Sequence, residues 1–197
     1  MNLPNRLTVF RILLVPILAL VWLFPYEQFG IVFMNVDFGF TTIPLLNLIV
    51  LAIFLIASIT DTLDGQIARR KNLVTTFGKF ADPIADKLLV NSMLIILAYK
   101  HMIPVVPVVF MICRDTIVDG CRMIASGKGF VVPAGVLGKL KTVLQMVTII
   151  IVLLNNMPFE LYSLPVSTLM IWFTAFVSIA SGYSYFVQLK QFIFESV

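Results

Sequence analysis

Six long apolar stretches alternate with short polar segments along the chain. The apolar stretches cover residues 8–25, 43–60, 84–99, 103–121, 140–157 and 165–187. The segments between them are rich in glycine, proline, asparagine or charge, which is typical of helix ends and turns. A helix needs about 20 mostly apolar residues to cross a bilayer. The pattern therefore predicts an all-α, multi-pass membrane protein with six transmembrane helices in one bundle.

Composition supports a chain that lies almost entirely in the membrane. Of the 197 residues, 60% are apolar and 12% are charged, whereas soluble domains carry roughly 25% charged residues. Six helices use up this length, so we expect a single membrane domain over residues 1–197. The first apolar run follows Arg6 and Arg11 as in a signal peptide, but no small-residue cleavage site comes after it. We expect it to be a retained first span.

The basic residues predict the orientation of the chain. With six spans and the N-terminus inside, one face collects nearly all lysines and arginines, and the other keeps Lys100 beside Glu27, Asp37 and Glu160. The basic face comprises Arg6, Arg11, Arg69, Arg70, Lys71, Lys79, Lys87, Arg122, Lys128, Lys139, Lys141 and Lys190. Because lysine and arginine accumulate on the cytoplasmic side, we expect both termini in the cytoplasm. Attraction to anionic headgroups explains some of these charges equally well.

Four aspartates fall between the second and third apolar runs: Asp61, Asp64, Asp82 and Asp86. Charged side chains near lipid are costly unless they face a polar cavity or a partner. The first two are three apart on a helix continuing from the second run, and the last two are four apart on the next helix. Each pair therefore shares one helix face. Two facing pairs can converge on one cavity.

Converging carboxylates would repel one another unless a cation is bound between them. Oxygen-only ligands favour Mg²⁺ or Mn²⁺, and Mg²⁺ usually completes its shell with water and substrate phosphates. A diphosphate substrate is therefore expected. Gly65 would let such a substrate approach the helix backbone, Ala68 keeps the same face small, and Arg69 is placed to hold phosphate or nucleotide.

Each of these residues also has a purely structural explanation. The first two aspartates can be interfacial caps, and Gly65 and Ala68 a seam of small residues for helix packing. Gly78 can stop a helix, and Asp82 can be an N-cap with Pro83 at the first helical position. All of these explanations are needed at once, whereas one metal site accounts for the whole set.

The spacing from Asp61 to Asp86 is D-x-x-D-G-x-x-A-R-x8-G-x3-D-x3-D. On this motif the chain resembles the CDP-alcohol phosphatidyltransferase family. The resemblance implies a six-helix membrane fold, usually homodimeric, with an active site that opens at the cytoplasmic surface. It implies that metal and the CDP diphosphate are bound by Asp61, Asp64 and Asp82. It further implies that Asp86 is the base for the acceptor hydroxyl and contacts the metal. By the same match the nucleotide site is lined by Gly65, Ala68, Arg69 and Thr75.

Three further segments are similar to the bacterial members of the family that make phosphatidylglycerol phosphate. They are Leu3–Arg11, Ala81–Leu88 and Gly138–Gln145. In those members the first segment reaches the nucleotide, so Asn5 and Thr8 are expected to contact CDP-diacylglycerol; capping of the first helix is compatible with this. The phosphate of an anionic acceptor is expected to be bound by Arg114, Arg122, Lys139 and Lys141, since a phosphomonoester needs guanidinium or ammonium partners.

One position departs from the subgroup pattern, where we expect Arg-Glu and find Arg114-Asp115. The shorter carboxylate must reach less far. Adjacent residues on a helix point apart, so we expect Arg114 to pair with Asp119 or with another helix rather than with Asp115. The aromatic residues, Tyr183 and Tyr185 among them, fit membrane-interface or packing roles.

The expected activity is transfer of a phosphatidyl group from CDP-diacylglycerol to sn-glycerol 3-phosphate, giving phosphatidylglycerol phosphate and CMP in phospholipid biosynthesis. The expected cofactor is Mg²⁺ or Mn²⁺, and the expected partners are the lipid bilayer of the bacterial inner (plasma) membrane and a second copy of the chain, with no nucleic acid. Inositol phosphate, serine or phosphatidylglycerol remain alternative acceptors. A divalent-cation transporter would distribute acids along a path to the other side, whereas these cluster at one face. A structural subunit would not require the motif.

Overall fold

The computed structural model describes the backbone of residues 2–70, 75–127 and 135–194. Side chains at residues 3, 62–70, 76, 79, 80 and 191–194 lie outside the described part. The described α-helices are α1 (Leu3–Leu23), α2 (Leu45–Arg70), α3 (Thr76–Tyr99), α4 (Val105–Gly127), α5 (Val136–Leu153) and α6 (Val166–Phe194). The short elements are the 3-10 helices η1 (Tyr26–Phe29) and η2 (Phe159–Tyr162), with the strands β1 (Asn35–Asp37) and β2 (Thr42–Pro44). The prediction of six helices is confirmed.

Two helices extend well beyond the apolar runs that predicted them. Helix α2 continues to Arg70, past the run that ended at residue 60, and α3 begins at Thr76 rather than at residue 84. The prediction followed apolar residues, but glutamine, alanine and arginine are good helix formers and carry a helix through a polar segment. The motif from Asp61 to Arg69 is therefore helical throughout its backbone.

A short β-hairpin between α1 and α2 departs from the all-α prediction. Its antiparallel pairs are Asn35 with Pro44, Val36 with Ile43 and Asp37 with Thr42. At the turn, Gly39 has a φ of +82° and its N–H donates to Asp37 Oδ1 at 2.8 Å. A left-handed φ favours glycine at this position. The strands are only three residues long, too short for an alternating pattern to show in an apolar sequence.

Three of the described helices are long and apolar enough to cross a membrane. The spans are Pro4–Leu23 in α1, Val136–Leu153 in α5 and Val166–Lys190 in α6. The apolar part of α2, Leu45–Asp61, is shorter. Helices α3 and α4 carry more charge, including the last two motif aspartates and the Arg114-Asp115 pair. These three spans indicate a membrane protein.

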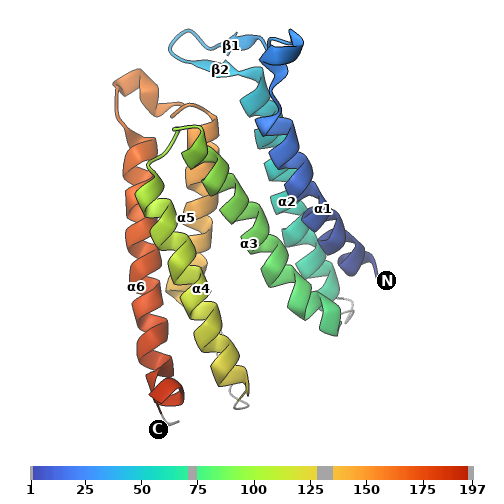
Figure 1. Cartoon of the computed structure of the whole chain (residues 1–197), viewed down its shortest axis with the longest axis vertical. Coiled ribbons are helices and arrows are strands. Elements are labelled where there is room, and N and C mark those ends of the chain that lie inside the picture. The colour runs from blue at the N-terminus through green and yellow to red at the C-terminus, as the bar shows by residue number, and fades with distance from the viewer. Residues whose placement is uncertain (1, 71–74, 128–134, 195–197) are drawn as a thin grey trace. The chain divides into compact units, whose positions relative to one another are not determined.

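The chain forms two compact units, of which the first comprises Met1–Ile96 and Leu153–Leu164. Within it, α1 and α2 lie side by side, as the blue and teal ribbons show (Figure 1). Leu18, Trp22 and Phe54 are almost fully buried in this unit. The indole of Trp22 donates to Asn47 Oδ1 at 3.3 Å, so its polar atom is satisfied in the apolar core.

The second unit comprises Leu97–Val152 and Pro165–Val197. In it α4 packs along α6 (Figure 1). Its interior holds a series of polar side chains, and Thr148 Oγ1 of α5 lies 3.1 Å from Thr174 Oγ1 of α6. Such hydrogen bonds between helices hold polar groups that have no water partner in a bilayer. The charged members of this series form a cluster of their own in the second unit.

Candidate active site

One face of α1 carries three polar residues at intervals of three, Asn5, Thr8 and Arg11, and all are buried. The Thr8 hydroxyl donates to Asp82 Oδ1 on α3 at 2.7 Å. Asn5 Oδ1 accepts a hydrogen bond from the Thr75 hydroxyl at 2.9 Å. Neither residue caps α1, which begins at Leu3. The first helix is thus joined through its polar face to the start of α3.

Thr75 directly precedes α3 and connects the first turn of this helix to α1. Its hydroxyl accepts the N–H of Gly78 at 3.0 Å, as an N-cap does, and donates to Asn5. A Cβ on Gly78 would lie 3.3 Å from Asn5 Oδ1 and 3.3 Å from Thr75 Oγ1. Gly78 therefore does not stop a helix; it lies in the first turn of α3 and leaves room for Asn5. Asp82 lies well inside α3 and is not an N-cap.

Arg11 lies between two of the motif aspartates. Its Nη1 contacts Asp61 Oδ1 of α2 and Asp86 Oδ1 of α3. The Arg11 side chain is fully buried, whereas the side chains of Asp61 and Asp86 are 27% and 37% exposed. The structure thus brings together aspartates from the two pairs, with a guanidinium bridging them. The sequence explains Arg11 as an orienting charge, but its spacing from Thr8 continues the polar face of α1.

The donor set of this cluster fits a hard divalent cation. Asp61, Asp82 and Asp86 offer the carboxylate oxygens that such a cation prefers. Among the side chains that the structure describes, no three acidic, histidine or cysteine groups stand close enough to hold a metal. The remaining motif residues have a helical backbone in α2, and their side chains lie outside the described part: Asp64, Gly65, Ala68 and Arg69.

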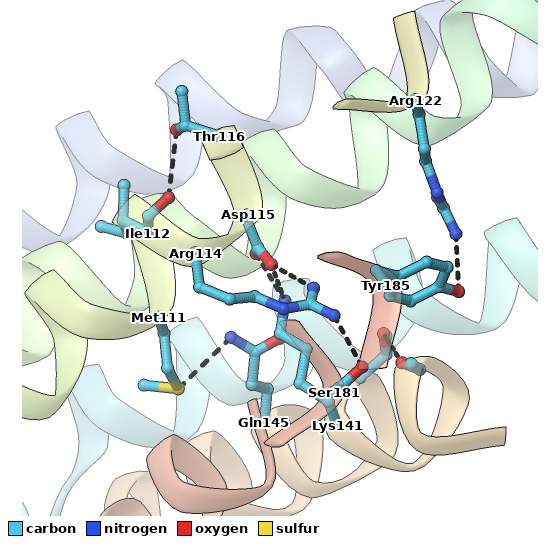
Figure 2. A network of polar contacts seen from close by, with 12 residues as sticks. Met111, Ile112, Arg114, Asp115, Thr116, Arg122, Lys141, Gln145, Ser181 and Tyr185 are labelled. Atoms are coloured by element: carbon cyan, nitrogen blue, oxygen red, sulfur yellow. Dashed lines mark hydrogen bonds and ion pairs between the residues drawn. The ribbon is translucent and has the colours of Figure 1, made fainter. Parts of the chain in front are cut away.

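A second charged cluster lies inside the second unit, where α4, α5 and α6 meet (Figure 2). Asp115 of α4 accepts hydrogen bonds from Lys141 of α5 and from Arg114 Nη1, the latter at 2.9 Å. Arg114 Nη2 also donates to Ser181 Oγ of α6 at 2.6 Å. Asp115 and Lys141 are both buried. Two cations here share one carboxylate.

Tyr185 of α6 joins Arg122 to this neighbourhood (Figure 2). Its hydroxyl oxygen accepts from Arg122 Nη2 at 2.7 Å and from the Gly135 N–H at 2.6 Å. The guanidinium carbons of Arg122 and Arg114 lie 4.5 and 5.7 Å from the centroid of its ring. An aromatic face attracts cations at such distances. Three of the four predicted acceptor-site cations are therefore brought together, whereas the Lys139 side chain is exposed.

The expectation that Arg114 would avoid Asp115 is wrong. The carboxylate of Asp115 is held by Lys141 from α5, and the long side chain of Arg114 bends back to the same oxygen. Its second terminal nitrogen does reach another helix, through Ser181. Helical spacing fixes where Cβ atoms point, but a side chain with four rotatable bonds can return to its neighbour.

Three residues of α6 were not anticipated as part of this cluster: Ser181, Gly182 and Tyr185. A Cβ on Gly182 would lie 2.8 Å from Arg114 Cγ, so the glycine makes room for the arginine. The signal in the sequence was a polar stripe on an apolar helix, since Ser178, Ser181 and Tyr185 recur at intervals of three and four residues. We had interpreted Tyr185 as an interface or packing residue.

Comparison with known proteins defines the class to which this fold and this motif belong. The chain belongs to the CDP-alcohol phosphatidyltransferase family, whose model matches residues 1–180. A protein of Bacillus subtilis (strain 168) named CDP-diacylglycerol–glycerol-3-phosphate 3-phosphatidyltransferase is 44% identical over 185 residues, covering 94% of this chain and 93% of its own length. A protein of the same name from Rickettsia bellii (strain RML369-C) is 36% identical over 192 residues, covering 97% of each chain. The resemblance inferred from the motif is confirmed.

Proposed function

We propose that this chain transfers the phosphatidyl group of CDP-diacylglycerol to sn-glycerol 3-phosphate, giving phosphatidylglycerol phosphate and CMP. The observation that carries the proposal is the meeting of Asp61 and Asp86 from successive helices at the buried Arg11. It brings the ends of the family motif to one place. The names of the relatives supply the acceptor, since the motif itself does not distinguish acceptors.

The aspartates are the proposed ligands of a divalent cation: Asp61, Asp64, Asp82 and Asp86. Mg²⁺ or Mn²⁺ would neutralise charge on the diphosphate and on the departing CMP. Thr8 fixes one carboxylate oxygen of Asp82, and Arg11 fixes one oxygen each of Asp61 and Asp86. These hydrogen bonds orient the carboxylates before the substrate arrives. The nucleotide is proposed to contact Asn5, Thr8, Gly65, Ala68, Arg69 and Thr75.

Asp86 is the proposed base in the transfer. A hydroxyl oxygen of the acceptor attacks the phosphorus that carries diacylglycerol, and Asp86 accepts the hydroxyl proton as the new P–O bond forms. The bond from that phosphorus to the bridging oxygen breaks, and the oxygen leaves with CMP. Asp86 suits this role because its carboxylate is more exposed than the guanidinium that it contacts, so an acceptor can reach it.

The acceptor phosphate is proposed to bind at the cations of the second unit: Arg114, Arg122, Lys139 and Lys141. Guanidinium and ammonium groups donate charge-assisted hydrogen bonds that an uncharged acceptor would not need. This argument favours glycerol 3-phosphate over serine. Glycerol 3-phosphate and inositol phosphate both carry a phosphate, so the charge does not distinguish them. The names of the relatives favour glycerol 3-phosphate.

The membrane arrangement is part of the same proposal. Six spans would place both termini and the motif on the cytoplasmic side, in agreement with the bias of lysine and arginine. The polar ends of α2 and α3 would then lie at the cytoplasmic surface of the inner membrane. A homodimer is proposed from the family resemblance. Fusion of a reporter active only in the cytoplasm to each terminus tests the orientation, because both fusions must be active.

The first experiment measures CMP release by the full-length chain purified in detergent. The assay supplies CDP-diacylglycerol, Mg²⁺ or Mn²⁺, and each acceptor in turn: glycerol 3-phosphate, inositol phosphate, serine and phosphatidylglycerol. Asp86→Asn removes the proposed base, and a loss of about 10²- to 10⁴-fold is expected. Asp37→Asn is the matched control, since Asp37 is exposed in the β-hairpin.

The outcomes separate the alternatives. Turnover with glycerol 3-phosphate alone, abolished in Asp86→Asn and kept in Asp37→Asn, supports the proposal. Turnover with a different acceptor would keep the metal and aspartate roles and overturn the substrate. An absence of CMP with every acceptor and both metals would overturn the proposal that the chain is an enzyme and would favour divalent-cation transport.

A further inference from the structure

The second charged cluster contains an acid that no step of the proposed reaction uses. Asp115 is buried, with a relative exposure of 4%, and both of its oxygens contact Lys141 Nζ, which is itself buried. Arg114 Nη1 reaches the same carboxylate at 2.9 Å. Removing charges from water is costly, so buried charges persist where they are paired. Here one carboxylate contacts two cations.

The arginines of this cluster also have hydrogen-bonding capacity left over. Arg114 Nε and Arg122 Nε are buried and have no hydrogen-bond partner among the described residues. A buried donor without a hydrogen-bond partner lowers stability, and the loss of free energy is larger when the donor is charged. Unused guanidinium donors are what a phosphomonoester dianion would satisfy.

The position of Arg114 is fixed at both ends of its guanidinium. Asp115 accepts from Nη1, and Ser181 of α6 accepts from Nη2 at 2.6 Å. Gly182 provides the space in which the aliphatic part of the side chain lies. A guanidinium held at two nitrogens loses its rotational freedom before a ligand arrives. Preorganised donors bind an anion more tightly because less entropy is lost on binding.

A simple packing role would not require charge at these positions. Well-packed apolar side chains of similar volume replace buried ion pairs at little cost, or even with a gain in stability. The three helices that meet here are otherwise apolar along most of their length. Retaining two cations and one acid inside them therefore points to a ligand that needs the cations, and to an acid that keeps them together.

We infer that Asp115 and Ser181 are positioning residues that hold Arg114 and Lys141 side by side to receive the phosphate of glycerol 3-phosphate. This inference rests on the proposed function. Asp115 accepts hydrogen bonds from both cations and so keeps them close together despite their mutual repulsion. Without its carboxylate, Lys141 and Arg114 would lose the acceptor that they have in common.

The test measures KM for each substrate and kcat separately in wild type, Asp115→Asn, Asp115→Glu and Ser181→Ala. Asp115→Asn should raise KM for glycerol 3-phosphate about tenfold or more, because two charge-assisted hydrogen bonds are lost. KM for CDP-diacylglycerol and kcat should stay within about threefold of wild type, since a positioning effect acts on the acceptor alone. Asp115→Glu keeps the charge and should recover most of the affinity. Ser181→Ala should raise KM for glycerol 3-phosphate about three- to tenfold.

Several results would overturn the inference. An unchanged or lowered KM for glycerol 3-phosphate in Asp115→Asn would show that the acid only restrains the cations. Equal changes in both KM values and kcat, together with a lower melting temperature, would show a structural role. If Asp115→Asn cannot be purified, Ser181→Ala decides, because it keeps every charge; an unchanged KM then overturns the inference. Wild-type turnover with glycerol 3-phosphate reports separately on the proposed function.

Discussion

The two charged clusters have opposite charges at their centres. In the first unit, the fully buried group is the cation Arg11, and the acids that it bridges, Asp61 and Asp86, are each about a third exposed. In the second unit, the buried group at the centre is the acid Asp115, which two cations share. In the described contacts, two carboxylates meet one guanidinium in the first cluster, and two cations meet one carboxylate in the second.

This difference in charge determines which kind of ligand each cluster can bind. A buried counter-charge lowers the repulsion among like groups around it without neutralising all of them. Carboxylates arranged around one guanidinium can still take a divalent cation, and cations arranged around one carboxylate can still take a phosphate. The proposed reaction would use both kinds of binding, because it would combine a metal-bound diphosphate with a phosphorylated acceptor. The following substitutions test each half of the comparison.

Asp61→Asn should have the largest effect on activity. Loss of one ligand should lower CMP release by about 100-fold or more, since charge neutralisation by a metal is worth several kcal/mol. Stability without metal should be kept or rise slightly, because one of the carboxylates around Arg11 becomes neutral. Asp37→Asn is the control for the same change at an exposed site. Activity above half of wild type, measured at saturating Mg²⁺, would remove the first cluster from catalysis.

Arg11→Met tests whether the buried cation holds the first cluster together. Two charge-assisted hydrogen bonds disappear, and a loss of about 1.5–3 kcal/mol in the free energy of unfolding is expected. For a chain of this size that corresponds to a melting temperature lower by about 3–12 °C. Arg11→Lys keeps the charge and should lose less.

The effect of Mg²⁺ on the melting temperature of Arg11→Met tests whether the guanidinium and a metal act on the same carboxylates. A divalent cation bound by Asp61 and Asp86 would replace the missing positive charge, so Mg²⁺ should raise the melting temperature of Arg11→Met more than that of wild type. Equal rises in the two proteins would mean that the guanidinium and the metal do not act on the same carboxylates.

The sequence predicts more of the first cluster than of the second. The first was predicted from the spacing of the aspartates, because i, i+3 and i, i+4 positions define a helix face whatever the side chains do later. Arg11 was missed, since a charge near the end of a span has an orienting explanation that competes with a binding one. The spacing also placed the aspartates on a continuing second helix and on the next helix, as observed. Only the exact ends of α2 and α3 were missed, because apolar runs mark spans and not helix ends.

The second cluster was predicted only as a set of cations. Sequence spacing could not show that Lys141 would reach Asp115 across two helices, or that Arg114 would bend back to its neighbour, because both depend on rotamers of long side chains. Tyr185 and Gly182 were hidden for another reason. A tyrosine or a glycine in an apolar helix is common, and its role is decided by what packs opposite to it.

Gly182→Ala and Gly120→Ala form a matched pair for the second cluster. A Cβ at Gly182 would meet Arg114 Cγ at 2.8 Å, whereas a Cβ at Gly120 would meet nothing within 4 Å. Overpacking of this kind costs about 1–3 kcal/mol, so Arg114 should shift and KM for glycerol 3-phosphate should rise several-fold. Gly120→Ala should leave KM unchanged and stabilise the helix by about 0.5–1 kcal/mol. Indistinguishable KM values for the two variants would show that the position of Arg114 does not matter to the acceptor.

Tyr185→Phe should have the smallest effect, because the ring beneath the guanidinium of Arg122 remains. The change removes only the hydroxyl oxygen that accepts from Arg122 Nη2 and from the Gly135 N–H. Leaving these buried donors without a partner should cost about 1–3 kcal/mol in the free energy of unfolding. Tyr183→Phe is the control, since Tyr183 lies on the same helix with 71% of its surface exposed.

Acceptor kinetics decide whether this hydroxyl belongs to the positive cluster. Arg122 keeps its charge and its aromatic support in Tyr185→Phe, so KM for glycerol 3-phosphate should rise only about two- to fivefold, within the range for one hydrogen bond. Tyr183→Phe should leave both KM and the melting temperature unchanged. A lower melting temperature with an unaltered KM in Tyr185→Phe would restrict the role of Tyr185 to joining α6 to the start of α5. The positive cluster would then consist of Arg114 and Lys141 around Asp115, without Arg122.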